Sequence, residues 1–175
     1  MTGNERPGTR ILGNLRSAGG KGVVRMEDRV DADVAEVWSA LTDPSRLARW
    51  YGEVEGELRP GGEYRARLLA SGWEGTGRVV ACEPRQRLLL VTRHVKAPDE
   101  GVIEVTLAAD GDLTLLAWEE RGMPLDHLAA YGAGIQVHVE DLAAHLAGQE
   151  RCDAEARFGE LLPAYRDLAA DVGLP

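Results

Sequence analysis

The sequence predicts an α+β domain in which a curved, seven-stranded antiparallel sheet packs around one long helix near the C-terminus. Three observations support this prediction. Apolar residues recur first with the period of a strand and then with that of a helix within residues 23–51. Six strand-like runs joined by short turns follow between residues 52 and 121. A long segment of helical period then covers residues 127–147, and a sheet with one apolar face must bury that face against such an element.

The first elements are a strand and two short helices. Apolar and polar residues alternate over 23–30, which indicates a strand. Asp33 and Glu36 then have the spacing of a capping box, and apolar residues follow at helical intervals. These apolar positions are Val34, Val37, Trp38 and Leu41. Residues 43–45 (Asp-Pro-Ser) end this helix, and residues 47–51 indicate a second short helix between the first two strands.

The six later strands alternate with turns rich in glycine and proline. They are expected at 53–59, 62–70, 73–83, 86–96, 101–109 and 112–121. Asp110-Gly111 is the best hairpin signal, because both central positions of a type I′ turn need a positive φ. Runs 86–96 and 112–121 contain consecutive apolar residues, which leaves the inward face of each strand undecided. An apolar outer face would suggest a homodimer or cover by the C-terminal helix.

The long helix is predicted from His127 to Ala147, and Gly148 ends it as a left-handed C-cap. Its apolar stripe consists of Leu128, Tyr131, Ile135, Val139, Leu142 and Leu146. Residues 149–175 form a helical extension that is expected to pack outside the main core, with Pro163 kinking or splitting the helix. The folded domain is therefore expected to cover residues 23–148.

Composition limits the functions open to this chain. Its 175 residues suit one domain, and 20 basic against 29 acidic residues give a net charge of −9, which argues against a nucleic-acid partner. No apolar run is long enough to span a membrane, and the two cysteines, Cys82 and Cys152, suit a reducing compartment. Without a secretory signal at the N-terminus, we expect a cytoplasmic protein.

Residues 1–22 differ from the rest of the chain. They are rich in glycine, and basic side chains outnumber the single acidic one at Glu5. Such a composition is typical of mobile segments, and we expect residues 1–22 to form a flexible basic leader.

A curved sheet that packs on one helix leaves a gap where it bends away, and this gap can form a pocket. The sequence also resembles the SRPBCC superfamily (START-like, Bet v 1-like), in the branch named after the activator of Hsp90 ATPase. The similar segments are residues 37–44 (VWSALTDP), 47–50 (LARW), 58–64 (LRPGGEY) and 132–148 (GAGIQVHVEDLAAHLAG). The resemblance implies a helix-grip fold around a mainly hydrophobic cavity. Relatives use that cavity for lipid or polyketide binding, cyclisation or drug sequestration, and others act as co-chaperones.

Six residues are candidates for contact with a ligand in this cavity. Apolar and aromatic walls are expected from Tyr64, Trp73, Trp118, Tyr131 and Ile135, with His138 as a polar anchor. Members of the family typically have Trp where this chain has Ile135, so its pocket is expected to be larger or differently shaped. Trp38 is expected to fill core.

No metal or cofactor site is predicted. His138, Asp141 and His145 share one flank of the long helix, but the outer two are too far apart along the axis to share an ion. The chain contains no nucleophile elbow, no phosphate-binding loop and no dinucleotide fingerprint, and both cysteines are expected to be inert. No catalytic residue is assigned.

Three functions fit these features. The first is non-enzymatic binding of a small hydrophobic or aromatic molecule in the cavity. The second is a cofactor-free enzyme, such as a cyclase or dehydratase, in which His138 and a partner such as Glu119 or Arg93 would move protons. The third, from the family resemblance, is a co-chaperone that acts through its outer surface.

Overall fold

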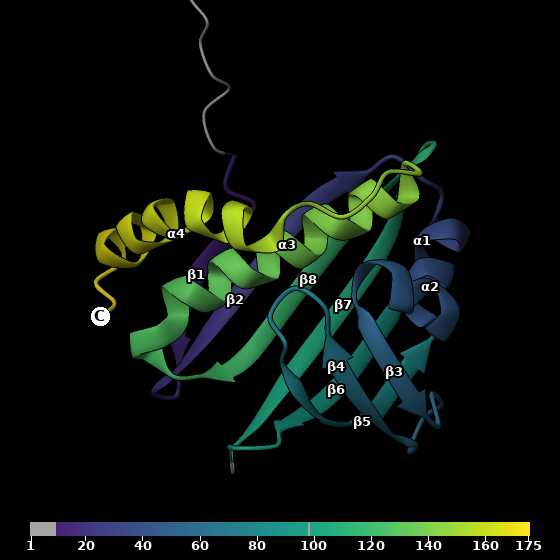
Figure 1. Cartoon of the computed structure of the whole chain (residues 1–175), viewed down its shortest axis with the longest axis horizontal. Coiled ribbons are helices and arrows are strands. Elements are labelled where there is room, and N and C mark those ends of the chain that lie inside the picture. Colours follow the sequence, from purple (N-terminus) through teal and green to yellow (C-terminus); the bar gives the residue numbers. More distant parts are fainter. Residues whose placement is uncertain (1–9, 98) are drawn as a thin grey trace, which may run out of the picture.

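In a computed structural model, which describes residues 10–97 and 99–175, one curved antiparallel sheet holds a long helix across one of its faces (Figure 1). The sheet has eight strands in the order β1-β2-β8-β7-β6-β5-β4-β3. Their bounds are β1 Gly13–Ala18, β2 Lys21–Val30, β3 Gly52–Gly56, β4 Glu63–Leu68, β5 Glu74–Glu83, β6 Arg87–His94, β7 Glu100–Asp110 and β8 Leu113–Met123. The α+β class and the sheet wrapped around a helix agree with the sequence prediction.

The eighth strand comes from the segment expected to be a flexible leader. β1 pairs with β2 from Gly13↔Met26 to Ala18↔Lys21, so the prediction of a leader is wrong for this part of the chain. Gly19 and Gly20, whose φ angles are 60° and 77°, form the tight turn between the two strands. The glycines thus serve a hairpin, and Leu15 anchors β1 because its side chain is buried in the core. Residues 1–9 lie outside the described part of the chain.

Two short helices, α1 (Val34–Thr42) and α2 (Pro44–Trp50), close one end of the sheet (Figure 1). Side-chain caps start both helices: Asp33 accepts a hydrogen bond from the Glu36 backbone N–H at 2.8 Å, and Asp43 accepts one from that of Ser45 at 2.9 Å. The indole of Trp50 is fully buried and donates to the carbonyl of Ala40 at 3.0 Å. This bond fixes α2 against α1.

The predicted hairpin between β7 and β8 forms, but its two turn residues lie one position later in the sequence than expected. Asp110 pairs with Leu113, so the turn residues are Gly111 and Asp112. Of these two, only Gly111 has a positive φ (62°), which differs from the type I′ turn expected.

The long helix α3 (Leu128–Leu146) follows a short 3-10 turn, η1 (Leu125–His127), and crosses the concave face of the sheet (Figure 1). Leu128, Ile135, Val139 and Leu142 of the predicted stripe are buried in the core. Among the described residues, no helix has both the length and the apolar character needed to cross a membrane.

Helix α4 (Ala154–Asp171) belongs to the core, which corrects the expectation that it packs outside it. Tyr165 is fully buried, and its hydroxyl donates to Gln136 Oε1 at 2.5 Å and accepts from the Gly13 N–H at 3.2 Å. The Tyr165 ring packs against Gly132, where any larger residue would collide with it. One tyrosine thereby joins α4, α3 and β1, and the helix continues through Pro163 without splitting.

Candidate ligand cavity

A cavity of about 950 Å³ lies between α3 and the concave face of the sheet. Its walls come from α1 and α2, from β3 to β8, from one face of α3 and from the first turns of α4. Known small-molecule sites have volumes of about 300–1,000 Å³ and are mostly apolar. The lining residues of this cavity are likewise mostly aliphatic or aromatic, so its size and surface suit a small hydrophobic molecule.

All six residues singled out from the sequence line this cavity. Tyr131, Ile135 and His138 come from α3 at positions i, i+4 and i+7, which lie on one face of a helix. Tyr131 is 41% exposed and stands where the cavity meets solvent, whereas Ile135 and His138 are buried. Their contact with a ligand remains a prediction.

The other three predicted residues come from the sheet. Tyr64 lies on β4, Trp118 on β8, and Trp73 directly precedes β5. Trp38, expected to fill core, is partly buried and also lines the cavity.

Two glycines of β5 provide flat surfaces for two of these aromatic rings. A Cβ added at Gly77 would collide with the ring of Tyr64, and one added at Gly75 would collide with the ring of Trp73. Tyr64 and Gly77 are direct partners across β4 and β5. The glycine-rich segment therefore lets both rings lie close to the sheet, which keeps the space above them open.

Four rings form a cluster in the wall of the cavity. Tyr51 packs against Trp50 with ring centroids 5.1 Å apart and against Trp118 at 5.9 Å. The ring of His138 meets Tyr51 edge-on at 5.0 Å. These spacings are those of attractive aromatic pairs, so the cluster is a preorganised wall.

Glu120 is a polar residue of the cavity that the sequence analysis did not identify. It follows Trp118 by two positions on β8, so both side chains face the cavity, and the Trp118 indole donates to Glu120 Oε1 at 3.1 Å. Burial raises the pKa of Glu120 to about 7, against the smaller opposing effect of that hydrogen bond. Burial and the nearby charge of Glu120 raise the pKa values of Tyr51 and Tyr64 above their usual range.

His138 is held in its neutral form. Burial, with a smaller contribution from the charge of Arg151, lowers its pKa to about 4. Its Nδ1 atom is buried and has no hydrogen-bond partner among the described residues. The imidazole is therefore an uncharged polar group in the cavity wall.

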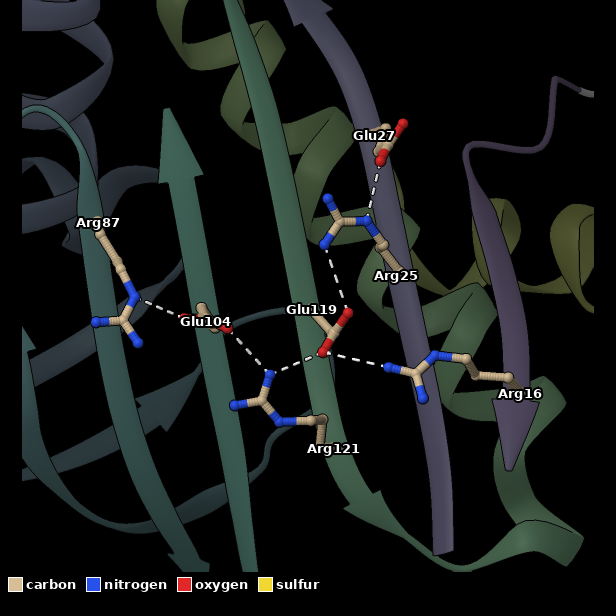
Figure 2. A network of polar contacts seen from close by, with 7 residues as sticks. All are labelled: Arg16, Arg25, Glu27, Arg87, Glu104, Glu119 and Arg121. Carbon is tan, nitrogen blue, oxygen red and sulfur yellow. Dashed lines mark hydrogen bonds and ion pairs between the residues drawn. The ribbon is translucent and has the colours of Figure 1, made fainter. Parts of the chain in front are cut away.

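Neither residue considered as a partner for His138 faces the cavity. Figure 2 shows Glu119 on the opposite face of the sheet, where Arg121 contacts it at 2.7 Å and Arg25 at 3.4 Å. Burial opposes ionisation of Glu119, but its bonds to Arg121 and the charges of Arg121 and Arg16 outweigh this and lower its pKa. Arg93 pairs with Glu100 at 3.1 Å. The carboxyl group of β8 that lines the cavity is thus Glu120, one residue further along the strand.

The network around Glu119 crosses the outer face from β6 to β1 (Figure 2). Its members are Arg16, Arg25, Glu27, Arg87, Glu104, Glu119 and Arg121. Helix α4 does not cover this face, because it packs against α3 and β1 on the concave side (Figure 1). The alternative of cover by the C-terminal helix is therefore wrong, and a homodimer stays a prediction.

Asp141 and His145 have partners of their own away from His138. Asp141 accepts a hydrogen bond from the Cys152 backbone N–H at 3.0 Å, and His145 Nε2 accepts one from Arg46 Nε at 3.2 Å. The three side chains that share the flank of α3 do not converge.

Known structures share this fold. CalU16 from Micromonospora echinospora is 28% identical, with a TM-score of 0.73 over 90% of this chain and 96% of its own. DynU16, a protein of the dynemicin biosynthetic locus, is 32% identical, with a TM-score of 0.68 over 75% of this chain and 50% of its own. EF2215 from Enterococcus faecalis, a conserved protein of unknown function, is 17% identical and shows the fold alone, with a TM-score of 0.71 over 91% of each chain.

Sequence comparison places the chain in one family. No curated protein matches it. The model of the family described as "Activator of Hsp90 ATPase homolog 1-like protein" matches residues 31–147, which extend from the segment before α1 to the end of α3. This is the branch suggested by the motifs in the sequence. The chain therefore belongs to the activator of Hsp90 ATPase homolog 1-like family, within the SRPBCC superfamily.

Proposed function

We propose that this protein binds a small hydrophobic or aromatic molecule in the cavity between the sheet and α3. The observation that carries the proposal is the cavity itself, about 950 Å³ with mostly apolar walls and several aromatic rings. Such walls bind planar apolar molecules through dispersion and loss of hydration. The locus of DynU16 supports a setting in small-molecule metabolism for this chain as well.

Gly134, a residue of α3, also supports the proposal. It lines the cavity within the helix, and a Cβ added there would meet no atom within 4 Å. Glycine inside a helix is about 1 kcal/mol less favourable than alanine. Gly132, two residues earlier, is needed for packing against Tyr165, but no neighbour requires glycine at 134. Glycine at position 134 therefore keeps space open in the cavity, although a larger residue would give a more stable helix.

The test uses 1-pyrenemethanol, an uncharged polycyclic probe whose fluorescence reports an apolar site. The wild-type protein should bind it, and Gly134→Phe should reduce its affinity about tenfold or more, because the new ring occupies the cavity. Gly159→Phe is the matched control, since Gly159 lies in α4, has open space at its Cβ and does not line the cavity. Equal affinities for the wild type and Gly134→Phe, or no binding by the wild type, would refute the proposal.

Glu120 favours a second candidate, a cofactor-free enzyme in the same cavity. A carboxyl group whose pKa lies near 7 can accept and return a proton at neutral pH, and the Tyr51 and Tyr64 hydroxyls could donate hydrogen bonds to a developing oxyanion. Native mass spectrometry of protein purified from its own host would identify a carried molecule. An enzyme would convert its substrate and lose turnover but retain binding in Glu120→Gln. A binding protein would release the molecule unchanged.

A further inference from the structure

The cavity contains a carboxyl group without a cationic partner. Of the described residues that line it, none is lysine or arginine, and the hydrogen bond that Glu120 accepts comes from the uncharged indole N–H of Trp118. On the outer face, by contrast, Glu104 and Glu119 each contact arginine. A buried carboxylate is unfavourable unless it is paired, so Glu120 is expected to gain most from a cation supplied with the ligand.

The surroundings of Glu120 favour such a cation. Tyr51, Tyr64 and Trp118 border the same part of the cavity, and the charge of Glu120 acts on both tyrosines. Aromatic faces attract an ammonium group through their quadrupoles, and a carboxylate adds a charge-assisted hydrogen bond. Oxygen Oε1 of Glu120 accepts a hydrogen bond from the Trp118 indole, whereas Oε2 accepts none from the described residues.

The other titratable groups that line the cavity do not compete with Glu120 for a cationic group of the ligand. His138 faces the same region from α3 and is neutral over most of the pH range in which Glu120 ionises. Tyr51 from the end of α2 and Tyr64 from β4 keep their protons, because their pKa values are raised. His94 lies against Trp73 and accepts a hydrogen bond from the Lys96 N–H. Glu155, the other carboxyl group that lines the cavity, is exposed to solvent in the first turn of α4, so its charge is hydrated without a ligand.

We propose that the ligand of this cavity is an aromatic or hydrophobic amine, whose ammonium group binds Glu120 Oε2 beside the rings of Tyr51, Tyr64 and Trp118. This inference rests on the proposed function and narrows it to one chemical class. The apolar body of the ligand would occupy the part of the cavity bordered by Tyr131, Gly134 and Ile135.

The experiment compares three pyrene probes that share one ring system: 1-pyrenemethylamine, 1-pyrenemethanol and 1-pyrenecarboxylic acid. Affinities are measured by fluorescence at pH 8, where Glu120 is mostly ionised. The wild type should bind the amine about tenfold or more tightly than the alcohol, as expected for a hydrogen bond between charged groups. In Glu120→Gln the two affinities should become similar. Lowering the pH to 5, where Glu120 is protonated, should remove the preference from the wild type.

Glu119→Gln is the matched control, because it removes the same charge from the adjacent position of β8 on the outer face of the sheet. The Glu119→Gln variant should keep the preference for the amine. This result would show that the preference comes from a contact in the cavity and not from general attraction of a cation to an acidic protein. Equal affinity for amine and alcohol in the wild type, a preference for the acid, or a preference that survives in Glu120→Gln would overturn the amine proposal and leave hydrophobic binding intact. Failure of all three probes to bind would overturn both.

Discussion

Replacing Glu120 with glutamine should stabilise the folded protein at high pH and have little effect at low pH. Burial raises the pKa of Glu120 from 4.5 to about 7, so the folded state holds this proton more tightly than the unfolded state does. The free energy of unfolding therefore falls as the pH rises from about 4.5 to 7. One pKa unit corresponds to about 1.4 kcal/mol, so the rise in pKa from 4.5 to about 7 corresponds to a loss of about 3–4 kcal/mol at pH 8. Glutamine avoids this loss and still accepts from the Trp118 indole.

His138 should produce the opposite slope in the same protein. Its pKa falls from 6.5 to about 4 on folding, so the unfolded state binds more protons between these values. Stability from neutral His138 is complete above pH 6.5 and is lost as the pH falls through 4. Between pH 4.5 and 6.5 the contributions of Glu120 and His138 to the pH dependence of the free energy of unfolding nearly cancel in the wild type. Glu120→Gln removes one of them and should reveal a rise in stability with pH over this range.

Urea denaturation followed by circular dichroism at pH 4, 5, 6, 7 and 8 tests both statements. For Glu120 the quantity compared is the difference in free energy of unfolding between variant and wild type at each pH, since other groups, His138 included, cancel in it. For His138 the quantity is the change in the free energy of unfolding of Glu120→Gln itself between pH 5 and 6, which should be a rise. Glu119→Gln should destabilise the protein at pH 7, because the pKa of Glu119 is lowered by its arginine partners. If Glu120→Gln were no more stable than the wild type at pH 8, or gained equally at pH 4 and pH 8, the inferred burial of this carboxyl group would be wrong.

Two further substitutions test the packing around the cavity. Gly77→Val should push the Tyr64 ring away from β5, with a loss of about 1–3 kcal/mol in stability and weaker binding of 1-pyrenemethanol, both measured on the same preparation. An unchanged probe affinity would show that the position of Tyr64 does not shape the site. Tyr165→Phe should cost about 1–2 kcal/mol, because Gln136 Oε1 and the Gly13 N–H lose a buried partner. An unchanged free energy of unfolding in urea would contradict a stabilising role of the Tyr165 hydroxyl.

Periodicity identified the parts of the site that lie on regular elements with one buried face. Tyr131, Ile135 and His138 could be placed together because a helix repeats every 3.6 residues, and all three line the cavity. Glu120 could not be distinguished from Glu119 in this way. Residues 115–118 of the same strand are consecutively apolar, and Leu115 is exposed on the outer face, so alternation did not reveal which side is buried.

Long-range pairing accounts for the other differences. A glycine-rich segment has the same composition in a flexible leader as in a tight hairpin, and the pairing of β1 with β2 decides between them. Tyr165 likewise lies far from its partners in the sequence, since Gly13 and Gln136 are 152 and 29 residues away. Local pattern alone does not indicate such contacts.

Gly132 and Gly134 show how α3 serves packing and cavity at once. Two residues correspond to about 200° around a helix, so the two glycines face nearly opposite directions. Gly132 allows the ring of Tyr165 from α4 to approach the helix closely, whereas Gly134 leaves open space on the cavity side. Because α4 also contributes Ala154 and Phe158 to the cavity wall, it both supports α3 from behind and borders the space in front. The C-terminal helix is therefore part of the cavity wall, although the family match ends at residue 147.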